Sequence, residues 1–466
     1  MKQLPQLLEG LLSVDVPDLA VMAVATDSRD VQPGALFIAL AGFGGPHGLS
    51  FAEQAVEAGA IAVLWEPADN APELPALSCA FVLAVPGLQH MVGVIAARFY
   101  GEPSTQMSVV GITGTDGKTS CAWLLLQAWQ QLQQDACMVG TLGKGRLGQL
   151  ERGAFTTPFP VELQSNFAGF AASECQNVAM EVSSHALDQG RVAATQFDVA
   201  VLTNLARDHL DYHGTVEAYA EAKQKLFDEY QPRAWVLNAD DKFGQKLAAA
   251  APAATEVITY GLGEAVLQAR NVQRQPGLVF ELCYQGQTYN VETTLLGDFN
   301  VYNLLAVAAV LVAQGASIEQ AVSCLENIQS PPGRLELFDS GRARVVVDYA
   351  HTPAALSASL ESLRNVTSGR VLCVFGCGGD RDAGKRPLMA AAAEKHAHLV
   401  WVTDDNPRSE SANVIFEDIR AGFVEPERVC FVHDRASAIA AAAAELQADD
   451  ILLVAGKGHD DYQLLG

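Results

Sequence analysis

Residues Gly111–Ser120, which read GITGTDGKTS, have the types and spacing that point most directly to chemistry. They follow a Val-rich stretch and open a stretch with helical spacing. Between a strand and a helix, backbone N–H groups and the helix N-terminus bind phosphates, and the ammonium of Lys118 would offset their charge. The strict spacing of the nucleotide-binding motif fails, because Ile112 stands at the position of its first glycine. The strand-turn-helix context nevertheless favours a phosphate site over a Gly-rich turn.

Two polar segments further along the chain offer metal ligands for such a site. They are MEVSSHAL at Met180–Leu187, after a strand-like Val178–Met180, and TNLARDHLDYH at Thr203–His213. A carboxylate and imidazoles at strand ends would complete the octahedral Mg²⁺ shell that a hydroxyl of the phosphate-binding turn begins. Solvated polar loops are the alternative, and the pattern leaves both open.

Lys223 stands in the segment YAEAKQKLF, between Glu221 and Lys225. The spacing predicts a charged helical face, and a lysine on such a face is normally exposed to solvent. Composition and spacing therefore give Lys223 no special role.

A third group of polar segments occupies the last third of the chain: VDYAHTP (347–353), GCGGDRDAGKR (376–386), TDDNPR (403–408) and GKGHDDYQ (456–463). Arg and Asp presented together suit a zwitterionic ligand, because a guanidinium pairs with a carboxylate while carboxylates pair with an ammonium. An amino-acid pocket is one interpretation, and structural turns with capping Asp and Asn are the other.

The elements that must position these segments read as alternating strands and helices. Apolar runs such as Gly34–Leu40 and Ala60–Leu64 alternate with helical stretches, and the alternation continues from Met107 to Ile318–Ile328. The last third repeats a buried-type strand that runs into a polar loop, at Val371–Phe375, Leu399–Thr403 and Ile451–Ala455. This pattern predicts an α/β fold of doubly wound parallel sheets, in which the ligand-binding loops lie at the carboxyl ends of the strands.

Two groups of turn-forming residues divide the chain. GEPST at 101–105 and SPPGR at 330–334 interrupt the pattern, so we expect domains at 1–103, 104–332 and 333–466. Three domains suit the length of 466 residues.

Composition narrows the class of protein further. With 30 basic and 54 acidic side chains the formal charge is −24, so we expect no nucleic-acid partner. No apolar run reaches the roughly 18 residues that span a bilayer, so no membrane insertion is expected. The nine cysteines contain no C-x-x-C pair, and we expect buried thiols in the cytoplasm. A monomer is expected.

Taken together, the motifs resemble those of the Mur ligase family over essentially the whole chain. The motifs that carry the resemblance occur in the family's order: TGTDGKT, MEVSSHAL, TNLARDHLDYHG, EAK, GDFNVYN, PGRLE, VDYAHTP, FGCGGDRD and DDNPR. The resemblance implies a three-domain architecture with a central P-loop doubly wound sheet and a C-terminal Rossmann-like domain. It also implies an ATP-dependent amide ligase of peptidoglycan precursor synthesis that uses Mg²⁺.

The resemblance implies roles residue by residue. UDP-N-acetylmuramoyl-L-alanyl-D-glutamate would contact two groups of residues: in the first domain, near its nucleotide part, Thr26, Ser28, Phe43, Gly44 and Gly45, and in the neighbouring domain, near its muramoyl-dipeptide part, Thr156, Thr157, Ser183, Gln189 and Arg191. ATP would contact Gly114, Thr115, Asp116, Gly117, Lys118, Thr119, Ser120, Asn303, Arg334 and Asp348. The amino acid to be added would contact Arg381, Asp405, Asn406, Pro407, Arg408, Gly456 and Asp460. Mg²⁺ would be held by Thr119, Glu181, His209 and a carbamylated Lys223, and the catalytic residues would be Lys118, Lys223 and His209.

Two of these implied roles have a physical reason. In the family, DNPR goes with meso-diaminopimelate as the added amino acid. A cation at Arg408 suits the second carboxylate of diaminopimelate and would repel the side chain of lysine. Carbamylation would turn the ammonium of Lys223 into an anionic oxygen donor, which would explain a lysine beside a metal site.

The sequence departs from the family's pattern at two site positions. Asp116 stands where the family usually has Asn, and Asp460 stands where it usually has Glu, so the contact of Asp460 with the ligand's distant ammonium would be longer or water-mediated. The printed sequence ends at Gly466, where family members generally continue with a further helix. The alternatives are an L-lysine-adding ligase, a folylpolyglutamate-type ligase, in which DNPR has no role, and a non-catalytic nucleotide-binding paralogue.

Overall fold

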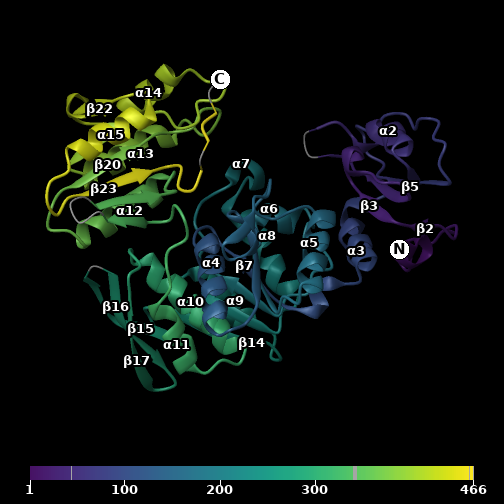
Figure 1. Ribbon diagram of the computed structural model, residues 1–466, viewed down its shortest axis with the longest axis horizontal. Coiled ribbons are helices and arrows are strands. Elements are labelled where there is room, and N and C mark those ends of the chain that lie inside the picture. Colours follow the sequence, from purple (N-terminus) through teal and green to yellow (C-terminus); the bar gives the residue numbers. More distant parts are fainter. Residues whose placement is uncertain (43–44, 276, 340–343, 461, 465–466) are drawn as a thin grey trace. The chain divides into compact units, whose positions relative to one another are not determined.

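The computed structural model describes residues 1–42, 45–275, 277–339, 344–460 and 462–464. The chain forms two compact units, Met1–Ile258 and Thr259–Gly466, and their boundary falls within strand β14 (Glu256–Gly261). Both units are built from helices packed on sheets (Figure 1). The predicted domain boundaries near residues 103 and 332 stay predictions.

The first unit begins with a short antiparallel pair, β1 (Lys2–Gln3) and β2 (Ala20–Val21), and a parallel sheet in the order β3-β4-β5-β6. The strands of that sheet are β3 (Ala23–Ala25), β4 (Ala35–Ala39), β5 (Ala60–Trp65) and β6 (Phe81–Ala84). Alternate residues of β4 face different layers. Leu36 packs with helices α1 (Leu4–Leu8) and α3 (Leu88–Tyr100), whereas Phe37 packs with α2 (Ala52–Glu57). The two strands predicted here are confirmed.

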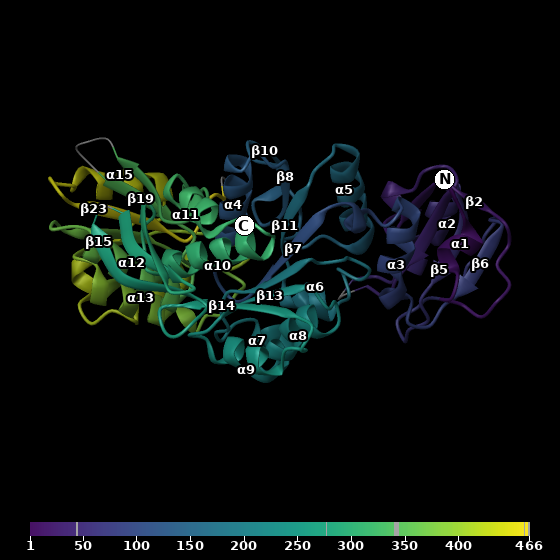
Figure 2. The same cartoon turned by 90° about the horizontal axis from the view of Figure 1, so that it is seen from below.

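A larger sheet in the same unit carries the P-loop, which we define as Gly114–Ser120. Its parallel strands are, in order, β8 (Ala136–Gly140), β11 (Asn177–Glu181), β7 (Ser108–Thr113), β12 (Val199–Leu202) and β13 (Ala234–Asn238). Figure 2 shows β8, β11 and β7 side by side. Strands β9 (Gly143–Arg146) and β10 (Gln149–Glu151) add antiparallel pairs beyond β8. These parallel strands are buried along nearly their whole length, as expected for a sheet covered on both faces.

Strand register brings the polar strand ends of this sheet together. Ile112 of β7 pairs with Glu181 of β11, and Thr113 pairs with Leu202 of β12. The P-loop therefore lies between the segments that follow β11 and β12. Helices connect and cover the strands: α4 (Lys118–Gln131), α5 (Pro160–Ala172), α6 (Ser184–Asp188), α7 (Leu210–His213), α8 (Val216–Asp228) and α9 (Lys242–Ala250).

The second unit begins differently from the sequence prediction. The strand-helix alternation was expected to continue, but β15 (Leu267–Gln275), β16 (Gly277–Tyr284) and β17 (Gln287–Thr293) form antiparallel hairpins. The turn between β16 and β17 consists of Gln285 (φ 49°) and Gly286 (φ 77°), and two left-handed residues match the twist of a two-residue hairpin. Helices α10 (Phe299–Ala313) and α11 (Ile318–Glu326) follow.

A six-stranded sheet in the order β18-β19-β23-β20-β21-β22 completes the second unit. Its strands are β18 (Glu336–Asp339), β19 (Arg344–Asp348), β20 (Val371–Phe375), β21 (Leu399–Val402), β22 (Cys430–Phe431) and β23 (Ile451–Ala455), and only β18 is antiparallel. Cys373 and Leu453 face α12 (Pro353–Asn365), α13 (Lys385–His396) and α14 (Ala412–Arg420), whereas Leu372 and Leu452 face α15 (Arg435–Ala444). The doubly wound prediction is confirmed.

The cysteines depart in part from the expectation of burial. All nine are free thiols, and Cys430 is exposed while Cys79 and Cys283 are partly buried. Cys430 begins β22, an edge strand of its sheet whose residues are exposed and partly buried, whereas the central strands β20 and β23 are buried throughout. In the part of the chain that the structure describes, no helix combines the length and apolar character needed to cross a membrane.

Candidate active site

The P-loop has a backbone conformation that requires glycine at Gly114. Its φ is +148°, and a Cβ at this position would lie 1.9 Å from Oγ1 of Thr203. Gly117, with φ of 85°, caps helix α4, and the amine of Lys118 folds back to donate to the carbonyl oxygens of Gly114 (2.9 Å) and Thr115 (2.8 Å). A helix N-terminus and an ammonium thus meet at one turn, which is the arrangement that binds phosphate.

The segment after β12 holds the P-loop in shape. Oγ1 of Thr203 donates to the carbonyl oxygen of Asp116 (2.6 Å), and Oδ1 of Asn204 accepts from the backbone N–H of Asp116 (3.0 Å). The N–H of Thr115 donates to the carbonyl oxygen of Asn204 at 2.9 Å. Part of the polar segment Thr203–His213 therefore stabilises the conformation of the P-loop, a role that its composition did not predict. The side chain of Asp116 is exposed, and its backbone makes these contacts.

Glu181 presents a fully buried carboxylate beside the P-loop. It accepts hydrogen bonds from Oγ1 of Thr119 (2.9 Å) and from the backbone N–H of Thr141 (2.8 Å). A Cβ on Gly140 would lie 2.2 Å from Oε1 of Glu181, so the glycine leaves room for the carboxylate. A hydroxyl and a carboxylate oxygen are therefore adjacent at this point.

Lys223 is buried, contrary to the exposed helical lysine that its sequence pattern predicts. Only 1% of its surface is exposed, and its amine donates to the carbonyl oxygen of Gly114 at 2.7 Å and lies over the ring of Tyr219 at 4.3 Å. Burial holds the pKa of Lys223 well below its ordinary value of 10.5, and the nearby charge of Lys118 lowers it further. The amine is thus part of the site.

Three imidazoles lie close together near Lys223. The ring of His185 is 4.9 Å from that of His209 and 5.4 Å from that of His213, between ring centroids. Burial lowers the pKa of all three, and that of His185 falls to about 4. A neutral imidazole is the form that binds a metal ion. His209 itself has a left-handed backbone, with φ of 52°, and is about half exposed.

The donor set beside the P-loop fits a magnesium ion. Mg²⁺ prefers oxygen ligands and is commonly held by one or two protein side chains, with phosphate oxygens and water completing the shell. Thr119 and Glu181 supply such a pair at 2.9 Å from each other. Among the described residues no group of three or more His, Cys, Asp or Glu side chains could hold a metal ion. For an ion held by this pair, phosphate oxygens and water would supply the remaining ligands.

Four residues predicted to contact the dipeptide part of a substrate lie together next to Glu181. Oγ1 of Thr157 donates to the carbonyl oxygen of Glu181 (2.8 Å) and accepts from the N–H of Ser183 (3.1 Å). The guanidinium of Arg191 donates to Oε1 of Gln189 (2.7 Å) and to the carbonyl oxygen of Thr157 (3.1 Å). Thr156 extends the group, because its hydroxyl lies 3.0 Å from that of Thr141.

The residues predicted to bind the nucleotide part of that substrate belong to the N-terminal sheet. Ser28 is buried, and its hydroxyl donates to Oε1 of Gln54 at 3.0 Å. Thr26 follows β3 and is partly buried, and Gly45 is exposed. Phe43 and Gly44 lie outside the described residues.

The remaining predicted ATP contacts lie in the second unit. The guanidinium of Arg334 lies over the ring of Tyr349 at 4.4 Å, and Asn303 is buried on α10 and donates to Oδ1 of Asn300 at 2.8 Å. The carboxylate of Asp348 accepts from the N–H groups of Leu335 (2.7 Å) and Ala350 (2.9 Å). Burial raises the pKa of Asp348. These bonds fix the end of β19.

The predicted amino-acid pocket gathers at the carboxyl ends of β21 and β23. Asp405 and Asn406 are buried, and the amine of Lys457 lies 3.6 Å from Oδ1 of Asp405 and donates to Oδ1 of Asn406 at 3.2 Å. Gly456 has φ of +110°, and a Cβ there would lie 3.2 Å from Oδ2 of Asp405. Lys457 therefore lies among the predicted pocket residues, although the sequence pattern singled out only the polar segment at 456–463 in which it stands.

The other predicted pocket residues lie in the loops around this group. Nη1 of Arg408 donates to the carbonyl oxygen of Gly379 at 2.7 Å, and Arg381 is exposed. Pro407 separates Asn406 from Arg408 in the same loop. The carboxylate of Asp460 lies 3.8 Å from Nε2 of His459. Charged groups of both signs are thus presented together, as a zwitterionic ligand requires.

Family models match three parts of the chain. Residues 21–100 match the model "Mur ligase family, catalytic domain", residues 112–311 match "Mur ligase middle domain" and residues 333–458 match "Mur ligase, glutamate ligase domain". A curated relative from Ectopseudomonas mendocina, "UDP-N-acetylmuramoyl-L-alanyl-D-glutamate--2,6-diaminopimelate ligase", is 47% identical over 464 residues, which cover 99% of this chain and 94% of the relative.

Solved structures agree with these matches. A structure of a UDP-N-acetylmuramoyl-L-alanyl-D-glutamate--2,6-diaminopimelate ligase has a TM-score of 0.73 and 34% identity, covering 99% of this chain and 95% of its own. The folylpolyglutamate synthase of Mycobacterium tuberculosis, complexed with ADP and AMPPCP, has a TM-score of 0.65 at 20% identity, covering 79% of this chain and 92% of its own. At that identity the likeness concerns the fold alone.

Proposed function

Because the chain belongs to the Mur ligase family, we propose that it is the ATP-dependent ligase that joins meso-diaminopimelate to UDP-N-acetylmuramoyl-L-alanyl-D-glutamate. This step belongs to peptidoglycan precursor synthesis. The identity of 47% over 464 residues to a curated ligase of this name carries the proposal. The oxygen donors beside the P-loop and the mixed charges around Asp405 support it.

The chemistry explains why ATP is needed. A carboxylate is a poor electrophile, because its oxygen is a poor leaving group. The γ-carboxylate of the D-glutamyl residue attacks the γ-phosphate of ATP and gives an acyl phosphate and ADP. An amine of diaminopimelate then attacks the acyl carbon, and the tetrahedral intermediate expels phosphate and leaves the new amide.

We assign the phosphate chemistry to residues of the first unit. Lys118 would offset the charge of the transferring phosphoryl group, and the P-loop N–H groups would orient it. One Mg²⁺ held by Thr119 and Glu181, and a second held by His209 and carbamylated Lys223, would neutralise phosphate charge. Thr157, Ser183, Gln189 and Arg191 would hold the dipeptide close to Glu181, a role that their mutual hydrogen bonds support.

We assign recognition of the added amino acid to the second unit. The guanidinium of Arg408 would pair with one carboxylate of diaminopimelate, and Asp405 and Asp460 would face its ammonium groups. Arg334, Asn303 and Asp348 would contact ATP. We expect the enzyme to act on small molecules as a monomer in the cytoplasm.

Leaving out one substrate at a time tests the proposal. With Mg·ATP, UDP-N-acetylmuramoyl-L-alanyl-D-glutamate and diaminopimelate together, we expect phosphate release and a product whose mass equals the two joined substrates less one water. Each omission should abolish both signals. Phosphate release without the joined product would contradict ligation. An intact fold that does not bind ATP by calorimetry would favour the non-catalytic paralogue.

A further inference from the structure

Two loops of the second unit carry most of the predicted amino-acid pocket. The first loop, residues 376–384, joins β20 to α13 and contains Arg381, and the second loop, residues 403–411, joins β21 to α14 and contains Asp405 and Arg408. We propose that Arg386 is a positioning residue for diaminopimelate, because its hydrogen bonds hold these two loops together. The inference rests on the proposed function and extends it to a residue outside the predicted site.

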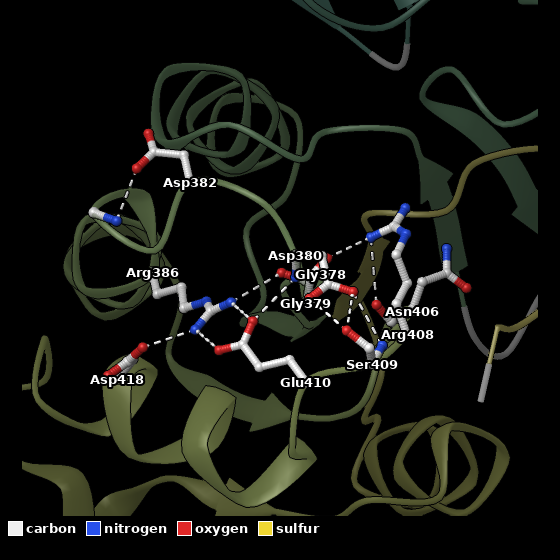
Figure 3. A network of polar contacts seen from close by, with 11 residues as sticks. Gly378, Gly379, Asp380, Asp382, Arg386, Asn406, Arg408, Ser409, Glu410 and Asp418 are labelled. Atoms are coloured by element: carbon white, nitrogen blue, oxygen red, sulfur yellow. Dashed lines mark hydrogen bonds and ion pairs between the residues drawn. The ribbon is translucent and has the colours of Figure 1, made fainter. Parts of the chain in front are cut away.

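Arg386 is a buried cation with partners on both loops. Only 1% of it is exposed, and its Nη1 and Nη2 donate to the two carboxylate oxygens of Glu410 at 2.7 and 2.6 Å. Nη1 also donates to Asp418 on α14 at 2.8 Å, and Nη2 donates to the carbonyl oxygen of Gly378 at 3.3 Å. Figure 3 shows the guanidinium between Glu410 and Asp418. One side chain on α13 thus joins the first loop, the second loop and α14.

The contacts continue from Glu410 to the residue next to Arg408. Glu410 accepts from the N–H of Asp380 at 3.1 Å. The carboxylate of Asp380 in turn accepts from the N–H of Ser409 at 3.0 Å and from its hydroxyl at 2.8 Å. Each loop is therefore held by the other immediately beside Arg408 (Figure 3).

The two loops also touch directly at Arg408. Its Nη1 donates to the carbonyl oxygen of Gly379 at 2.7 Å, and the N–H of Gly379 donates to the carbonyl oxygen of Asn406 at 2.9 Å. A Cβ on Gly379 would lie 1.9 Å from the carbonyl oxygen of Pro407. Small displacements of one loop would therefore move the guanidinium of Arg408.

Two residues of these loops have strained backbone conformations that the surrounding contacts must maintain. Asp380 and Arg408 both adopt left-handed backbone conformations, with φ of 53° and 55°. Residues with a side chain hold this conformation only where their surroundings impose it. The hydrogen bonds of Asp380 to Glu410 and Ser409 supply that constraint, and Arg386 fixes Glu410.

If Arg386 only stabilised the fold, its buried ion pairs with Glu410 and Asp418 would not be needed. A buried ion pair adds little net stability compared with apolar packing, because removing the charges from water is costly. The planar guanidinium does, however, fix two carboxylates and a carbonyl in one geometry, which an ammonium does not. We therefore expect Arg386 to act on the pocket geometry, through Arg408, rather than on folding alone.

The pair Arg370 and Asp450 offers a matched control in the same sheet. Nε and Nη2 of Arg370 donate to Oδ2 of Asp450 at 3.0 and 2.7 Å, and Asp450 is buried. The two residues directly precede β20 and β23, at the amino ends of the strands. The pair thus resembles Arg386 with Glu410 in chemistry but lies at the opposite end of the sheet from the loops.

The experiment compares steady-state kinetics of the full-length wild type with Arg386→Lys, Arg386→Met and Arg370→Met. For both Arg386 variants we expect the KM for diaminopimelate to rise about tenfold or more, with the KM values for ATP and the UDP-linked substrate within about twofold of wild type. The preference for diaminopimelate over L-lysine should fall as well. Arg370→Met should lower Tm without changing the KM for diaminopimelate.

An unchanged KM for diaminopimelate in both Arg386 variants, with only a lower Tm, would overturn the inference. If those variants do not fold, Glu410→Gln keeps the shape of the network without its charge and should raise the same KM. A wild type that adds another amino acid instead would contradict the proposed function, and the KM for that amino acid would then decide the role of Arg386.

Discussion

The amines of Lys223 and Lys118 donate to the same carbonyl oxygen, that of Gly114, at 2.7 and 2.9 Å. This shared acceptor ties helix α8 to the P-loop and places two amines, each able to carry a positive charge, at one buried carbonyl oxygen. Like charges at such a point repel each other strongly, because burial weakens solvent screening. A carbamate on Lys223 would replace this repulsion with attraction to Lys118 and would add an oxygen ligand for Mg²⁺.

Replacing Lys223 with alanine tests this role. We expect Lys223→Ala to lower kcat at least about a hundredfold, because it removes an anionic group beside the transferring phosphate. Short carboxylic acids should restore part of the activity by occupying the vacated space. Lys225→Ala is the control, since Lys225 stands on the same helix but pairs with Asp188 at the surface. The rate of phosphate release is measured for Lys223→Ala without and with the acids, and for Lys225→Ala. Full activity of Lys223→Ala would exclude a role of the carbamate in the reaction.

Glu181 should determine how much magnesium the enzyme needs. Glu181→Gln keeps the size of the side chain and removes its charge, so we expect the Mg²⁺ concentration for half-maximal activity to rise about tenfold. Glu162→Gln removes a carboxylate from a partly buried pair with Lys144 and should leave that concentration unchanged. A Glu181→Gln enzyme with the magnesium requirement of wild type would remove Glu181 from the metal site.

Asp116 should weaken ATP binding slightly. Its side chain is exposed, and its backbone, not its carboxylate, is held by Thr203 and Asn204. Asp116→Asn therefore removes a negative charge without changing the P-loop. We expect the KM for ATP to fall about two- to fivefold, less at high salt, because solvent screens an exposed charge. A higher KM in the variant would mean that the carboxylate assists binding.

The pair of Arg386 and Glu410 predicts a dependence of stability on pH. The Arg386 guanidinium lowers the pKa of Glu410 to about 2, from its ordinary value of 4.5. A carboxyl group whose pKa is depressed by folding stabilises the folded state above its unfolded pKa, and this contribution disappears as the pH falls through the folded pKa. The Tm difference between wild type and Glu410→Gln should therefore be constant at neutral pH and shrink as the pH falls from 4.5 toward 2. A difference that persists unchanged in calorimetry down to about pH 3 would contradict this account.

The parts of the site that are local in sequence could be predicted from the sequence. The P-loop needs a strand, a glycine turn and a helix start within ten residues, and the strand-end segments around Asp405 follow buried-type strands directly. Parallel strands then bring those segments to one edge of the sheet. The continued βα pattern was wrong at β15–β17, because the partner and direction of a strand depend on tertiary packing more than on local residue types.

Contacts between distant residues could not be predicted in this way. Lys223 reads as an exposed lysine, and its burial depends on a contact with Gly114, 109 positions earlier. Arg386 ends a polar segment that suggested a ligand loop, but its partners Glu410 and Asp418 lie 24 and 32 positions away. The bracing of the P-loop by Thr203 likewise depends on how β12 pairs with β7. Such roles depend on tertiary packing, which residue types and spacing do not encode locally.

The measurement that tests the central claim most directly is the ratio of kcat/KM for meso-diaminopimelate to that for L-lysine. It is obtained from phosphate release by the wild-type chain with Mg·ATP and UDP-N-acetylmuramoyl-L-alanyl-D-glutamate. We predict a ratio of about a hundred or more, because Arg408 offers a partner to the second carboxylate of diaminopimelate and L-lysine leaves it unpaired. Equal values for the two amino acids would contradict the account.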